Sequence, residues 1–87
     1  MFEKKATIVR QIGLCARPAT FLIQKANEFK SSIWIEKDER RVNAKSLLGV
    51  LSLGVAQGAT INIIADGPDE SLAVETLCEL INSDFAE

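Results

Sequence analysis

Strand-like and helix-like patterns of apolar residues follow one another along this 87-residue chain, and their order restricts the folds open to it. Residues 2–9 alternate between two faces and end in β-branched side chains, which predicts a strand. Residues 16–29 instead carry apolar side chains three and four positions apart, which is typical of an amphipathic helix. Pro18 fits the first turn of that helix, where the missing N–H of proline costs nothing.

The rest of the chain predicts a hairpin, a short helix, a strand and a final helix. Residues 31–44 contain two strand-like runs, and residues 37–40 (KDER) form the expected turn between them. A serine before an apolar run indicates a helix start, so we expect a short helix at about 47–53. The last strand is predicted at 59–67. DGPDE at residues 66–70 is expected to be a turn followed by the start of the last helix, which runs to about residue 83.

The order β-α-β-β-α-β-α predicts an α+β fold for a single domain covering residues 1–87. Each helical segment has one apolar stripe, which suits helices packed on one face of a single sheet. The alternative architecture is a ferredoxin-like fold, which would lack the short helix at 47–53.

Composition removes several classes of function. The net charge of −2, from ten basic and twelve acidic side chains, gives no electrostatic basis for binding nucleic acid. No apolar run approaches the roughly 20 residues of a membrane span. The first residues are charged too early for a signal peptide, so we expect a cytoplasmic protein with reduced thiols. Because histidine is absent and no cysteine pair has ligand spacing, the sequence gives no support for a zinc site. It implies no bound cofactor either.

Cys15 lies at the expected start of a helix, two residues before Arg17. A helix start offers unpaired N–H groups and a positive dipole end, and a nearby guanidinium adds to their effect. Together they would lower the pKa of a thiol and favour its thiolate form. Such a thiolate could act as a nucleophile, a phosphoryl acceptor or a redox sensor. The alternative that these residues leave open is a small side chain at a helix cap.

Ser46 directly precedes the short apolar helix, and Lys45 and the Arg40–Arg41 pair are close to it in sequence. A phosphate on its hydroxyl would lie on the N–H groups of the following turn, where the helix dipole favours negative charge. The alternative is a plain N-cap serine, worth about 1 kcal/mol.

The segment SLLGVLSL, which begins with this serine, holds more apolar side chains than one buried stripe requires. Leu47, Leu48 and Leu51 cannot all point inward together with Val50 and Leu53. One interpretation is an exposed set of leucines, which would indicate a docking surface for another protein. The other is a small helix that is buried on two sides.

Two motifs resemble those of the HPr family of the bacterial phosphoenolpyruvate-dependent sugar phosphotransferase system. They are GLCARPATF at residues 13–21 and VNAKSLLGVLSLGVAQG at residues 42–58, and the resemblance covers nearly the whole chain. The family fold is an open-faced β-sandwich, a four-stranded antiparallel sheet of order 1-4-2-3 with three helices on one face. The resemblance implies the same fold here.

The resemblance also implies roles for individual residues. Cys15 stands where the family has the histidine that takes a phosphoryl group from enzyme I and passes it to sugar-specific IIA proteins. Arg17 matches the arginine that helps to stabilise that phosphoryl group. Ser46 matches the serine that the ATP-dependent HPr kinase/phosphorylase phosphorylates, after which the protein binds catabolite control protein A as a corepressor. The residues that match the partner-docking surface are Thr20, Leu47, Leu48 and Leu51.

The chain reads GLCARP where the carriers of the family read GLHARP. Members without the histidine form the Crh-like class, which keeps the regulatory serine and acts in carbon catabolite repression. The first hypothesis is therefore a Crh-like regulatory protein, switched at Ser46 and not itself an enzyme. The second is a phosphocarrier, such as a histidine-to-cysteine variant of HPr, in which Cys15 accepts the phosphoryl group. The third is a redox sensor that uses the Cys15 thiol.

Overall fold

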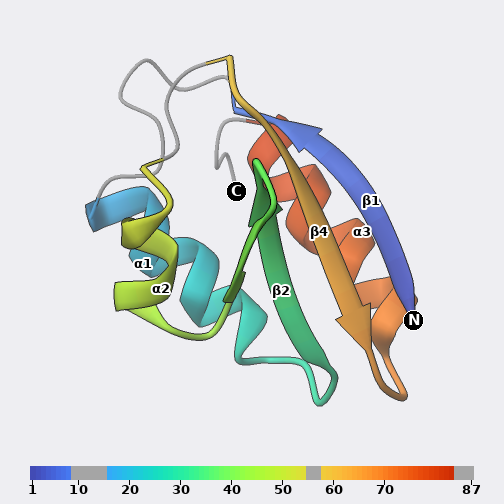
Figure 1. The fold of residues 1–87 in the computed structure, drawn as a ribbon. Helices are drawn as coiled ribbons and strands as arrows, with labels where there is room; N and C mark the ends of the chain where they lie inside the picture. The colour runs from blue at the N-terminus through green and yellow to red at the C-terminus, as the bar shows by residue number, and fades with distance from the viewer. Residues whose placement is uncertain (9–15, 55–57, 84–87) are drawn as a thin grey trace.

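The computed structural model describes residues 1–8, 16–54 and 58–83, with the backbone alone at residues 16 and 17. The elements in these ranges are β1 (Phe2–Thr7), α1 (Ala16–Ala26), β2 (Ser32–Lys37), β3 (Arg40–Asn43), α2 (Leu47–Ser52), β4 (Thr60–Asp66) and α3 (Glu70–Asn82). The strands form one antiparallel sheet of order β1-β4-β2-β3. Figure 1 shows α3 behind β1 and β4, with α1 and α2 side by side near β2. The α+β, HPr-like open-faced β-sandwich is thus confirmed, and the presence of α2 rules out the ferredoxin-like alternative.

The register of the sheet places one set of apolar side chains under the helices. Ala6 of β1 pairs with Ile61 of β4, and Ile35 of β2 pairs with both Ile63 of β4 and Val42 of β3. Because side chains alternate along a strand, these residues share the face that packs against the helices. Each helix contributes to this same core, which fixes its position on the sheet. The hydrophobic core residues of the helices are Ala19, Leu22 and Ala26 of α1, Val50 of α2, and Ala73, Val74, Leu77, Cys78, Leu80 and Ile81 of α3.

Helix α1 ends earlier than its apolar pattern predicted, at Ala26 rather than near residue 29. The backbone N–H and the side-chain Nδ2 of Asn27 both donate to the carbonyl of Ile23, at 3.0 and 2.9 Å. Glu28 and Phe29 then donate to carbonyls three residues back instead of four. Such tight bonds end an α-helix, because the next turn no longer has the α-helical pitch.

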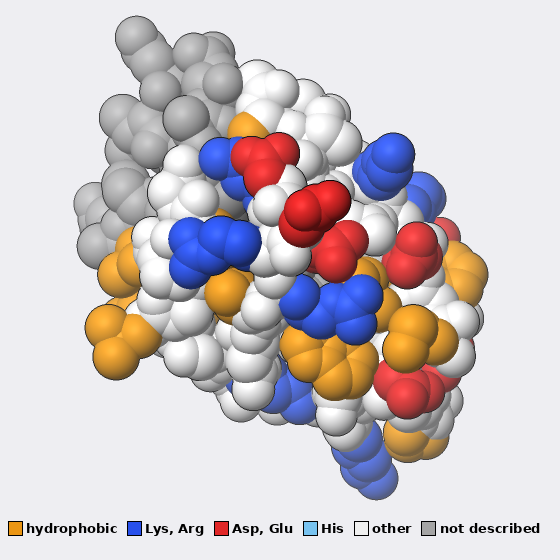
Figure 2. Space-filling view, viewed as in Figure 1, with side chains coloured by type: hydrophobic (Ala, Val, Ile, Leu, Met, Phe, Trp, Pro, Cys, Tyr) orange, Lys and Arg blue, Asp and Glu red, His pale blue; other side chains and the backbone are white. Residues whose placement is uncertain are grey.

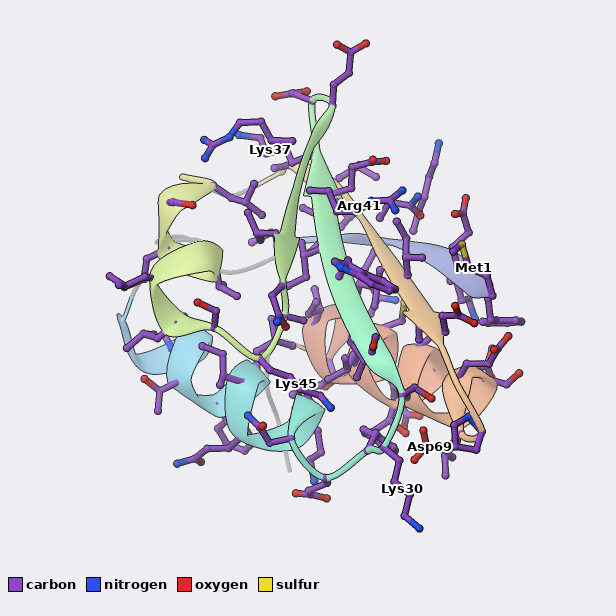
Figure 3. The ribbon with its side chains drawn as sticks, turned by 60° about the horizontal axis from the view of Figure 1, so that its bottom comes forward. Met1, Lys30, Lys37, Arg41, Lys45 and Asp69 are labelled. Carbon is purple, nitrogen blue, oxygen red and sulfur yellow. The ribbon has the colours of Figure 1, made fainter. Side chains whose placement is uncertain are left out.

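Helix α3 begins at Glu70, at the end of the DGPDE segment (66–70) in which the sequence predicted a turn and a helix start. The N-cap residue, Asp69, makes no side-chain cap bond to its own helix. Its carboxylate instead accepts bonds from the N–H groups of Lys30 and Ser31, both at 2.9 Å, and from the Ser31 hydroxyl. That hydroxyl in turn accepts the N–H of Asp69 at 3.2 Å. These bonds join the α1–β2 connection to the β4–α3 connection, where Figure 3 shows Lys30 and Asp69 together.

Asp69 makes the stability of the fold sensitive to acid. The hydroxyl of Ser31, followed by the N–H of Lys30, lowers the pKa of the Asp69 carboxyl from its ordinary value of 3.8 to about 2. A carboxyl with a lower pKa in the folded chain stabilises the fold above its unfolded pKa and loses that contribution as the pH falls. We therefore expect the free energy of unfolding to drop between about pH 4 and pH 2, more steeply for the wild type than for Asp69→Asn. Urea denaturation across this range measures both slopes, and equal slopes would contradict the role given to Asp69.

The turn between β2 and β3 uses two residues in the left-handed conformation, Asp38 with φ 50° and Glu39 with φ 70°. Positive φ at both central positions is the type I′ hairpin, which prefers glycine at the second of them. Glu39→Gly should therefore raise the free energy of unfolding by about 1 kcal/mol. The same change at Glu79, an exposed position inside α3, should lower it by about 1 kcal/mol. Denaturant titrations compare the two variants, and a decrease for both would refute this description of the turn.

Candidate functional site

Ser46 caps the N-terminus of α2, as the sequence predicted. Its backbone is extended, with φ −110° and ψ 118°, and its Oγ accepts the N–H of Gly49 at 3.2 Å. Its carbonyl accepts the N–H of Val50 at 3.0 Å, which is the first bond of the helix. The hydroxyl therefore lies next to the unpaired N–H groups that begin a helix.

The segment that leads into Ser46 is held by its own hydrogen bonds. The N–H of Ser46 donates to the carbonyl of Asn43 at 3.1 Å. The side-chain Oδ1 of Asn43 accepts the N–H of Lys45 at 2.8 Å, which is an Asx-type turn. The ammonium of Lys45 then donates to the carbonyl of Phe29, just past the end of α1, at 2.9 Å. Figure 3 shows Lys45 beside this end of α1.

The apolar side chains of α2 divide into a buried set and an exposed set. Val50 and Leu53 are buried, with exposures of 0% and 6%, whereas Leu47, Leu48 and Leu51 are 43%, 82% and 36% exposed. Figure 2 shows hydrophobic side chains protruding at the edge of the molecule where α2 lies. Of the two interpretations of this segment, the structure therefore supports the exposed one. We call Leu47, Leu48 and Leu51 the leucine patch.

The other predicted site residues are only partly covered by the structure. Cys15 lies outside the described residues. Arg17 belongs to the first turn of α1 by its backbone, and its side chain lies outside the description. The pairing of the two therefore stays a prediction. Thr20 is exposed on α1, the helix that lies beside α2 in Figure 1.

The second cysteine, Cys78 of α3, is a free thiol with 2% of its surface exposed. Burial raises the pKa of this thiol, and the positive charge of Lys4 offsets the effect only in part. Its Sγ donates to the carbonyl of Lys4 at 3.8 Å. A buried, protonated thiol is a weak nucleophile, so Cys78 serves packing rather than chemistry.

Two features are absent from residues 1–8, 16–54 and 58–83. No group of three or more cysteine, aspartate or glutamate side chains in these ranges is arranged to hold a metal ion. None of the helices described there is long and apolar enough to cross a membrane.

One contact of α2 could not be seen in the sequence. Arg40 of β3 reaches the end of α2, where its Nη1 donates to the carbonyl of Ser52 at 2.9 Å. Its Nη2 lies 3.4 Å from the Ser52 Oγ. Helix α2 has no basic residue in its own last turn, so a cation from another element interacts with its negative dipole end. Nothing in the local sequence indicates which cation this is.

The chain is similar to proteins of one family along its whole length. A family model described as "PTS HPr component phosphorylation site" matches residues 2–83. The HPr-like protein Crh of Halalkalibacterium halodurans is 45% identical over 84 residues, which cover 97% of this chain and 100% of that protein. The phosphocarrier protein HPr of Neisseria meningitidis is 39% identical, with 100% of this chain and 98% of that protein covered.

The three-dimensional comparison agrees with the sequence comparison. The crystal structure of HPr-C-His from Thermoanaerobacter tengcongensis has a TM-score of 0.95 to this chain at 47% identity, covering 100% of this chain and 98% of that one. The strand order, the three helices and the matched motifs therefore all lead to the same assignment. The chain belongs to the HPr family of the bacterial phosphotransferase system, and it is similar to the Crh-like members.

Proposed function

We propose that this chain is a regulatory protein switched by phosphorylation of Ser46. In this proposal HPr kinase/phosphorylase transfers the γ-phosphoryl group of ATP to the Ser46 Oγ, the hydroxyl proton is lost, and ADP is released. The phosphorylated chain then binds catabolite control protein A in the cytoplasm and acts as its corepressor in carbon catabolite repression. The observation that carries the proposal is a capping serine at the edge of the exposed leucine patch.

The position of Ser46 suits a phosphate. The group would add about two negative charges at the positive end of the α2 dipole, beside the N–H of Gly49 that now bonds the hydroxyl. The first turn of α2 contains no acidic residue that would repel it. Phosphorylation should therefore leave the helix in place and stabilise its start.

The same phosphate would change which proteins fit the surface beside it. Leu47 follows Ser46 directly, so the new charge would lie at the rim of the leucine patch. A partner that combines an apolar pocket with a basic group would gain affinity. A partner with acidic groups at that place would lose affinity.

Intact-mass spectrometry tests the proposal. Incubation of the wild type with ATP, magnesium and HPr kinase/phosphorylase should add the mass of one phosphate, and Ser46→Ala should remain unmodified. Ser52→Ala is the matched control, because Ser52 lies in the same helix with its hydroxyl bonded to the Gly49 carbonyl at 2.7 Å. It should still gain the phosphate. A wild type that stays unmodified would exclude the serine switch.

A second candidate function is a phosphocarrier that uses Cys15 between enzyme I and IIA proteins. The 39% identity to the phosphocarrier protein HPr of Neisseria meningitidis favours it. Incubation with enzyme I and phosphoenolpyruvate should then add one phosphate that Cys15→Ala loses. An unmodified mass under these conditions would end this alternative.

A further inference from the structure

Helix α2 has only six residues, far fewer than the roughly 12–15 that an isolated helix needs to be even marginally stable in water. Its own buried side chain is Val50. Its position must therefore depend on contacts that other elements make with it and with the residues just before it. Two cationic side chains, Arg40 and Lys45, make such contacts at its two ends.

Arg40 acts on the C-terminal end of α2. Its guanidinium donates to the Ser52 carbonyl at 2.9 Å and lies 3.4 Å from the Ser52 hydroxyl. That hydroxyl donates to the Gly49 carbonyl at 2.7 Å, so the arginine joins a network within the last turn. The last carbonyls of a helix lack intrahelical partners and carry partial negative charge, which makes a guanidinium a strong partner for them.

Lys45 acts on the N-terminal end. Its ammonium donates to the Phe29 carbonyl at 2.9 Å in a partly buried position. Its backbone N–H is bonded to the Asn43 side chain at 2.8 Å. Both groups of Lys45 are therefore held, and the next residue is Ser46. The start of α2 is thereby fastened to the end of α1.

We propose that Arg40 and Lys45 are positioning residues that hold α2 at both ends and thereby present Ser46 and the leucine patch in one geometry. Neither residue needs to touch the docking protein for this effect. If either bond is lost, α2 spends part of its time away from the competent position, and the apparent affinity for a docking protein falls by that fraction. The identity of the docking protein rests on the function proposed above, whereas the stabilisation of α2 by Arg40 and Lys45 does not.

Hydrogen exchange in the free protein tests whether these contacts stabilise α2. The amides of Leu53 and Gly54 donate to the carbonyls of Val50 and Leu51. Arg40→Ala should raise their exchange rates about tenfold, because a charge-assisted bond to the last turn is lost. Arg40→Lys, which keeps the charge without the fork of donors, should give a smaller increase.

Arg41→Ala is the matched control for Arg40→Ala. The pairing of Arg40 with Lys37 and of Arg41 with Glu36 puts the two arginines on opposite faces of the sheet. The Cζ of Arg41 lies over the Trp34 ring, 6.0 Å from its centroid. Its Nη2 forms an ion pair with the Oε2 of Glu36 at 3.5 Å. Its replacement should leave the amides of α2 unchanged.

The role of Lys45 is measured by amide exchange at the start of α2. Lys45→Met keeps most of the aliphatic stem and removes the ammonium. It should raise the exchange rates of the Ser46 and Val50 amides about tenfold.

A second substitution that strengthens the helix can show whether Arg40 and Lys45 act by positioning α2 or by contacting the docking protein directly. Gly49→Ala adds helix propensity at a position where a Cβ would meet its nearest atoms at 3.4 Å, and it should restore much of the protection in both variants.

Phosphorylation kinetics test whether the positioning of α2 affects the modification of Ser46. With HPr kinase/phosphorylase, Arg40→Ala and Lys45→Met should raise KM about twofold and leave kcat unchanged, and Arg41→Ala should match the wild type. Unchanged amide exchange in both variants would overturn the proposal, even if KM rises, because the residues would then contact the kinase directly. A wild type that is not phosphorylated at all would refute the proposed function, while the exchange measurements would still decide the hold on α2.

Discussion

Replacing Leu48 with glutamate is expected to weaken the binding of the Ser46-phosphorylated chain to catabolite control protein A by at least about 30-fold. Leu48 is 82% exposed, more than Leu47 or Leu51, so a partner that docks on the leucine patch would bury it. A carboxylate in its place would have to lose its water without gaining a partner. The fold should be unaffected, with a change in unfolding free energy within about 0.5 kcal/mol. Isothermal titration calorimetry measures the first effect and thermal unfolding the second.

Leu72→Glu is the matched control for this prediction. Leu72 of α3 is also a large exposed leucine, with 63% of its surface accessible, on a helix that is not expected to dock. Its replacement should leave the affinity for catabolite control protein A within a factor of about two, since the contact surface stays intact. Equal losses for the two variants would mean that the leucine patch has no special role.

Gly67→Ala is expected to cost about 3 kcal/mol of unfolding free energy, a large effect for one added methyl group. Gly67 has φ 155°, a conformation that side chains rarely adopt. A Cβ there would lie 2.6–2.8 Å from atoms of Ser31, one of them the backbone Cα. Ser31 cannot move away easily because Asp69 binds its N–H and its hydroxyl. Urea denaturation at neutral pH measures the loss.

Gly54→Ala separates the two causes of that loss. Gly54 also has a positive φ, of 61°, but a Cβ there would meet nothing within 4 Å. Its replacement should cost only about 1 kcal/mol, the strain of a left-handed alanine. If Gly67→Ala costs no more than Gly54→Ala, the close approach to Ser31 is not a constraint on the fold.

The elements of the fold could be predicted from the sequence because each carries a local signal. The alternation before Thr7, the helical spacing after Ala16 and the serine ahead of Leu47 depend on neighbouring residues only. The structure places an element at each of these positions. The N-cap role of Ser46 was predictable for the same reason, because a cap bond joins residues three apart.

The contacts between distant residues could not be predicted in this way. The carboxylate of Asp69 binds Ser31, which is 38 positions away in the sequence. Arg40 reaches α2 only because β3 pairs with β2 and turns its side chain toward that helix. Both contacts depend on the completed sheet, and no local pattern encodes them.

The exposure of the leucine patch lies between these two cases. The sequence showed that α2 has too many apolar residues for one buried stripe, but the period of the pattern does not say which of them are covered. The packing of α2 on the core decides which residues are covered, since Val50 is buried and Leu48 is exposed to solvent. The predicted role of Cys15, which lies outside the described residues, stays a prediction.

The most direct test of the serine switch is the affinity of the chain for catabolite control protein A before and after phosphorylation of Ser46, measured by calorimetry under the same salt conditions. We expect the phosphorylated chain to bind at least about tenfold more tightly, because charge-assisted bonds to the phosphate would add to the apolar contact. Equal affinities for the two forms would contradict the idea that a charge at the start of α2 selects the partner.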